Sequence, residues 1–174
     1  MKSSSVQKLT KLSLFAAVAL AVYGFESLLP PLLPIPGMKP GLANIVTLLL
    51  LQKTNGKNTA LVLLVRILLS ALLFGQAVSL LYSLAGGTFC LLTELLLGRM
   101  LRGRALPLIS AFGGLSHNLG QLLIACLLTA SIAPLSYLPY LIVAGVLTGL
   151  FVGLCSHFLL KALPKSLFPQ GGET

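Results

Sequence analysis

The sequence contains no aspartate, and its only acidic residues are Glu26, Glu94 and Glu173. Without aspartate the chain cannot form the Asp-rich motif that holds Mg²⁺ and a diphosphate in prenyltransferases. Charged residues of both signs make up only 9% of the chain, whereas soluble domains carry roughly a quarter. This composition excludes an ordinary soluble enzyme domain, and so low a charge content also excludes a disordered chain.

Tryptophan is absent, and cysteine is limited to Cys90, Cys126 and Cys155, which lie in apolar runs without CxxC spacing. This pattern indicates neither a disulfide framework nor a metal cluster. The net charge of +9 comes from lysines and arginines in small groups at the ends of apolar runs, so there is no basic face for nucleic acid. The sequence also lacks paired carboxylates and the motifs of nucleophilic or metal catalysis. We therefore expect no enzymatic activity, no cofactor, no metal and no nucleic-acid partner.

Apolar sequence is abundant: 56% of the residues are apolar, and the mean hydropathy is +1.00. Because a bilayer core of roughly 30 Å needs about 20 residues per helix, the chain has room for six spans and short connections. We predict one all-α transmembrane domain over residues 1–174, a six-helix bundle with spans near residues 12–29, 40–52, 59–75, 80–98, 107–130 and 137–163. The second span is short and follows a proline-rich outer segment, residues 30–37, that cannot be regular helix.

The basic residues orient these spans. With the N-terminus inside, the cytoplasmic segments hold ten lysines and arginines, and the outer loops hold only Lys39. The positive-inside rule therefore predicts a multi-pass protein of the bacterial cytoplasmic membrane with both termini in the cytoplasm. A cleaved signal peptide in place of the first span is disfavoured, because its removal would leave five spans and an N-terminal proline-rich segment.

Several hydrogen-bonding side chains fall in or beside the predicted spans, where each ionisable residue costs about 2.5–3.5 kcal/mol. They are Glu26, Lys39 and Asn44 toward the outer side, and His117, Asn118 and Gln121 near the middle of the fifth span. We predict that these six residues line an outward-opening site for a small polar or anionic solute. The alternatives are an interfacial Glu26 that reaches water and a structural network between helices around His117.

Arg66 lies about 10 Å inside the cytoplasmic end of the predicted third span, and Glu94 has a similar depth in the fourth. If these two helices touch, we expect the two residues to form a structural ion pair. The alternative is that Arg66 turns inward and binds the substrate.

Small residues at helical spacing predict close contacts between helices. The sixth span carries GxxxGxxxG at Gly145, Gly149 and Gly153, a pattern that leaves open whether the contact is inside the bundle or with a partner. In the first span, Ala17 and Ala21 lie roughly opposite Glu26. This helix is therefore expected to use one face for a neighbouring helix and another for a carboxylate.

Several motifs together resemble a known family. They are ESLLP at residues 26–30, PGMKPGLANIVT at 36–47, Arg66, the pair Gly86-Gly87, and HNLGQ at 117–121. In these motifs the chain resembles small bacterial membrane proteins described as Gx transporters or as heptaprenyl diphosphate synthase component I. That family is similar in turn to the S components of energy-coupling-factor (ECF) vitamin transporters. The chain departs from the family pattern at Pro40, where leucine is more usual.

The resemblance implies a fold like that of an ECF S component, with six helices, both ends inside and a solute captured near the outer face. It also implies that Ala17 and Ala21 contact a membrane coupling subunit, which works with cytoplasmic ATPases. We therefore expect a subunit that binds and translocates a small solute, in contact with membrane lipid. The alternative is a non-catalytic membrane accessory of a heptaprenyl diphosphate synthase, partnered by a separate prenyltransferase. A third possibility, a membrane scaffold, predicts no bound solute.

Overall fold

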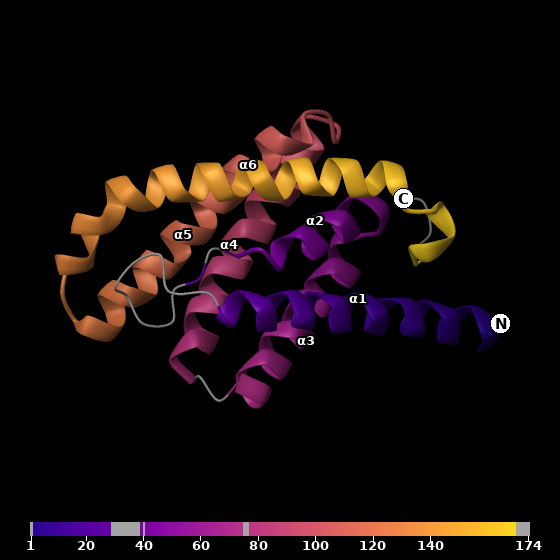
Figure 1. Ribbon diagram of the computed structural model, residues 1–174, viewed down its shortest axis with the longest axis horizontal. Helices are drawn as coiled ribbons and strands as arrows, with labels where there is room; N and C mark the ends of the chain where they lie inside the picture. Colours follow the sequence, from indigo (N-terminus) through magenta and orange to yellow (C-terminus); the bar gives the residue numbers. More distant parts are fainter. Residues whose placement is uncertain (1, 29–38, 40, 75–76, 170–174) are drawn as a thin grey trace.

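The computed structural model describes residues 2–28, 39, 41–74 and 77–169, and this part of the chain consists of helices and connecting loops (Figure 1). Five helices are long: α1 (Lys2–Leu28), α3 (Gly56–Phe74), α4 (Ala77–Met100), α5 (Leu106–Thr129) and α6 (Leu138–Ala162). The sixth, α2 (Asn44–Lys53), is short, and two 3₁₀ turns, η1 (Ala133–Tyr137) and η2 (Lys165–Leu167), flank α6. The predicted all-α class is confirmed for the described residues.

The number of membrane crossings is only partly established. The five long helices of the described residues are long and apolar enough to span a bilayer. By contrast, α2 has ten residues, which rise only about 15 Å, so it cannot cross a bilayer core of about 30 Å by itself. It begins later than predicted because residues 41–43 form a turn. Six crossings therefore stay a prediction, and the proline-rich segment 30–37 lies outside the described residues.

The start of α1 and the segment that follows α6 lie at the same end of the bundle (Figure 1). Lys11 Nζ donates hydrogen bonds to the carbonyl oxygens of Ser166 (2.6 Å) and Phe168 (3.2 Å). The rings of Phe15 and Phe168 also stack, with their centroids 5.5 Å apart. These contacts tie the start of α1 to the segment after α6, whereas the side of the membrane on which the ends lie stays a prediction.

The short helix α2 occupies the centre of the bundle, where it contacts α1, α3, α4 and α6 (Figure 1). Leu48 and Leu50 in α2 are completely buried. A helix too short to span is tolerated at membrane depth where protein surrounds it, and this packing supplies that condition. The position of α2 also brings its first residues to the middle of the bundle.

The glycine repeat of α6 packs against α5 inside the bundle. A carbon added at Gly153 would lie 2.6 Å from Pro107 Cα, and one added at Gly145 would lie 2.8 Å from the carbonyl oxygen of Gly114. The two backbones therefore approach as closely as small-residue interfaces allow. The sequence left open whether the glycine repeat contacts a helix of the bundle or a partner protein, and the structure shows a contact with α5 inside the bundle.

Candidate functional site

The turn before α2 is held by a carboxylate from α1. Gly41 has φ +83°, a conformation that glycine adopts without strain, and its N–H donates a hydrogen bond to Glu26 Oε1. The next turn forms as the Asn44 N–H donates to the carbonyl oxygen of Gly41 at 2.9 Å. Glu26 is only 2% exposed, so it is a buried group at the start of α2 rather than an interfacial side chain.

An aromatic ring lies near two cations beside this turn. Lys39 Nζ lies 3.8 Å from the centroid of the Tyr23 ring, and the guanidinium carbon of Arg66 lies 5.6 Å from the same centroid. Both distances are within the range of cation–π attraction. The Tyr23 hydroxyl is 2.8 Å from Ser79 Oγ, so α4 fixes the ring from its far end.

His117 on α5 joins the polar groups of the other helices. Its Nδ1 is 3.3 Å from Asn44 Nδ2, and its Nε2 is 3.0 Å from Gln121 Nε2. Gln121 Nε2 also donates to the carbonyl oxygen of Lys39 at 3.3 Å. Gly86 on α4 makes room for the imidazole, since a carbon added there would lie 2.9 Å from His117 Cε1.

These contacts bring together side chains from five helices and from the segment before α2. We call this group the polar cluster; it consists of Tyr23, Glu26, Lys39, Asn44, Arg66, Ser79, His117 and Gln121. Four of its buried atoms have no hydrogen-bond partner among the described residues: Glu26 Oε2, Lys39 Nζ, Arg66 Nε and Gln121 Oε1. Buried polar atoms without partners are costly, so the cluster has unused capacity to bind a polar ligand or water.

Asn118, also predicted for the site, is engaged elsewhere. Its Nδ2 donates a 2.8 Å hydrogen bond to the carbonyl oxygen of Leu141 on α6. His117 and Gln121 are four residues apart and share a helix face, whereas Asn118 is rotated by about 100°. In this structure Asn118 therefore ties α5 to α6, and its predicted contact with a ligand stays a prediction.

The expected ion pair between Arg66 and Glu94 is wrong. Both carboxyl oxygens of Glu94 lack a hydrogen-bond partner among the described residues, and Arg66 lies beside Tyr23. The reason is depth: α3 begins at Gly56, so Arg66 lies roughly 15 Å along it. Glu94 lies only about 9 Å from the end of α4. Glu26, not Glu94, is the acid near enough for its charge to act on Arg66.

Three further residues, which the sequence did not indicate for the site, hold Lys39 and Glu26 in place: Tyr23, Gly41 and Ser79. Tyr23 could have been found, because it precedes Glu26 by three residues and shares its helix face. The role of Gly41 depends on a positive φ, which the composition of the segment does not reveal.

The face of α1 that carries Ala17 and Ala21 is exposed, together with Leu14 and Val18. The opposite face, with Tyr23 and Glu26, is buried. The described part of the chain therefore leaves this small-residue face largely uncovered. Its predicted role as a partner interface stays a prediction.

Comparison with known proteins gives one result. The family model described as heptaprenyl diphosphate synthase component I matches residues 15–159. No curated protein and no solved structure matches the chain. The matched range covers most of the 174 residues and includes every member of the polar cluster. The chain therefore belongs to the heptaprenyl diphosphate synthase component I family.

Proposed function

We propose that the protein is a non-catalytic membrane component of a prenyl diphosphate synthase. The match to the component I family over residues 15–159 carries this proposal. Prenyl transfer needs acidic ligands for Mg²⁺, and the chain has no aspartate. The reaction would therefore take place on a separate subunit, which this chain holds at the membrane.

The proposal predicts a stable association with a prenyltransferase. A tagged version of the chain, extracted from its native membranes, is expected to co-purify with a soluble Asp-rich prenyltransferase. Deleting the chain is expected to abolish the membrane-associated synthesis of long prenyl diphosphates, which mass spectrometry can measure. Retention of full synthase activity after the deletion would contradict the proposal.

A second candidate function is the capture and uptake of a small polar or anionic solute. The polar cluster favours it, because four of its buried atoms lack partners among the described residues and two of the four belong to cations. In a low-dielectric interior such groups bind a complementary charge strongly. The exposed small-residue face of α1 would then contact a coupling subunit that works with cytoplasmic ATPases.

If the cluster binds a solute, native mass spectrometry should detect a small molecule retained by the purified protein. We expect Lys39→Ala and His117→Ala each to lower this retention about tenfold or more, since hydrogen bonds to charged groups contribute about 1.5–3 kcal/mol. His157→Ala is the matched control, because His157 lies near the end of α6 outside the cluster. An Ala17→Leu/Ala21→Leu variant should keep the bound molecule and lose uptake. Equal retention by all the variants would exclude the cluster as the site.

A further inference from the structure

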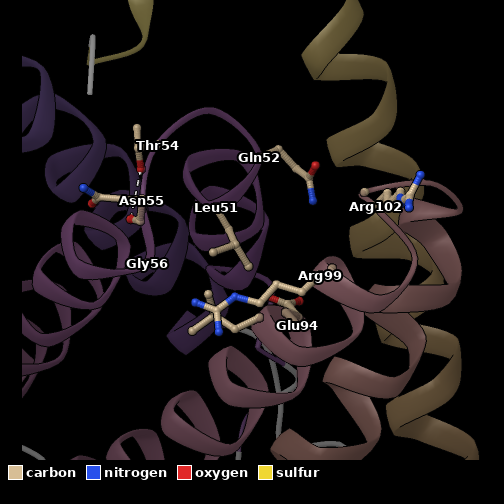
Figure 2. A pocket seen from close by; sticks show the side chains of 11 residues that line it. Leu51, Gln52, Thr54, Asn55, Gly56, Glu94, Arg99 and Arg102 are labelled. Atoms are coloured by element: carbon tan, nitrogen blue, oxygen red, sulfur yellow. Dashed lines mark hydrogen bonds between the residues drawn. The ribbon is translucent and has the colours of Figure 1, made fainter. Parts of the chain in front are cut away.

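A second polar site lies at the end of the bundle that carries the basic loops, which the positive-inside rule predicts to face the cytoplasm. A cavity of about 420 Å³ opens between the α2–α3 turn and the α4–α5 loop (Figure 2). Its walls include Gln52, Asn55 and Gly56 from the turn, and Glu94, Arg99 and Arg102 from α4 and the loop. None of these residues belongs to the polar cluster.

One part of this cavity suits a phosphate. Figure 2 shows Arg99 extending from α4 across the cavity toward the turn, and Arg102 on the side of Gln52. The turn also presents the N-terminus of α3, where Asn55 Oδ1 accepts the Asn58 N–H at 2.9 Å and the preceding N–H groups have no acceptor within the helix. Two guanidinium groups and a helix N-terminus are the donors that phosphate groups bind.

Glu94 also lines this cavity and favours a ligand that carries a positive charge. It is only 1% exposed, and neither carboxyl oxygen has a hydrogen-bond partner among the described residues. A buried carboxyl without a cationic partner is costly to ionise, and a cation placed beside it would stabilise its charged form. A ligand that carries an ammonium beside its phosphate would satisfy both Glu94 and the arginines.

An apolar groove continues from this cavity along the bundle. It has a volume of about 360 Å³, lies between α3 and α4, and shares Gly56 and Leu95 with the cavity. On α3 it runs from Gly56 to Ile67, which is roughly 16 Å along the helix. That length is about half of a bilayer core of 30 Å, so the groove matches the hydrocarbon depth of one leaflet.

We propose that the cavity and the groove together bind an aminophospholipid of the adjoining leaflet. Its phosphate would contact Arg99, Arg102 and the start of α3, its primary ammonium would contact Glu94, and one acyl chain would occupy the groove. A prenyl diphosphate would also fill the groove, but it has no cation for Glu94. The aminophospholipid therefore accounts for more of the polar groups that line the cavity.

The test compares lipids that share the same acyl chains and differ only in the headgroup. The full chain is placed in nanodiscs that contain phosphatidylethanolamine, phosphatidylcholine or phosphatidylglycerol, and retained lipids are counted by native mass spectrometry. We expect phosphatidylethanolamine to be retained best. Glu94→Gln should reduce its preference over phosphatidylglycerol about tenfold, and Arg99→Gln/Arg102→Gln should reduce the retention of both lipids.

Two further variants test the headgroup contacts and the acyl-chain groove independently. Arg104→Gln is the matched control, because Arg104 is an exposed arginine of the same loop that does not line the cavity, and it should change nothing. Ala60→Phe, which places a ring in the groove, should reduce retention without altering the headgroup preference.

A measurement on the unaltered protein does not depend on the folding of any variant. Successive N-methylation of phosphatidylethanolamine should lower its retention stepwise, because each methyl group removes a donor to Glu94. Equal retention along this series, or stronger retention of farnesyl diphosphate than of phosphatidylethanolamine, would overturn the proposal. Neither result would bear on the association with a prenyltransferase, which is measured separately.

Discussion

Replacing Gly114 with leucine is expected to cost about 3 kcal/mol of folding free energy or more, because it forces α5 and α6 apart. A carbon at this position would overlap the carbonyl oxygen of Gly145 and lie 2.9 Å from Gly149 Cα. These neighbours are backbone atoms, which cannot move aside as a flexible side chain can. The effect should appear as a lower midpoint of thermal or SDS-induced unfolding in mild detergent.

Gly98→Ala provides the matched control on α4. A carbon added at Gly98 meets nothing within 4 Å, so the unfolding midpoint should stay the same or rise slightly, as expected for alanine in place of a helical glycine. If Gly114→Leu were as stable as Gly98→Ala, the close contact between α5 and α6 would be wrong.

Hydropathy alone located the five long helices, because a membrane span must be apolar over about 20 residues. The predicted bounds of the fifth span, 107–130, differ by one residue at each end from α5 (Leu106–Thr129). The start of α3 was harder to predict. The sequence predicts a span that begins at residue 59, whereas the helix begins at Gly56 and buries Asn58 in its first turn. That error of three residues contributed to the wrong pairing of Arg66 with Glu94.

The cost of polar side chains in lipid was a good guide to which residues would gather. Glu26, Lys39, Asn44, His117 and Gln121, all predicted to line one site, come from four separate segments and lie in one cluster. Arg66, expected to pair with Glu94, also belongs to this cluster. Hydropathy could not indicate which groups contact each other, since that depends on depth and on rotation about each helix axis. Asn118 shows the limit: it is next to His117 in sequence but donates its hydrogen bond to α6.

We expect the buried charges of Glu26 and Arg66 each to lower the free-energy cost of burying the other. Glu26 is 2% exposed and Arg66 is 4% exposed, and each lies near enough for its charge to act on the other. Glu26 Oε2 and Arg66 Nε have no hydrogen-bond partner among the described residues, so the two charges interact without a direct bridge. Removing either charge leaves the other uncompensated, at a cost of up to about 3–5 kcal/mol. Glu26→Gln is therefore expected to lower the free energy of unfolding by about that amount, even though glutamine can still accept the Gly41 N–H.

The double variant Glu26→Gln/Arg66→Met separates charge from packing. With both charges removed, neither residue leaves the other uncompensated, and only Lys39 keeps a charge in the cluster. The stability should therefore return to within about 1–2 kcal/mol of the original protein, as happens when buried pairs are replaced by neutral groups. Reversible unfolding of the two single variants and the double variant at neutral pH completes the cycle. Additive losses would show that the two charges do not interact. In that case some other group would stabilise the charge of Arg66, and a bound anion would be the first candidate to test.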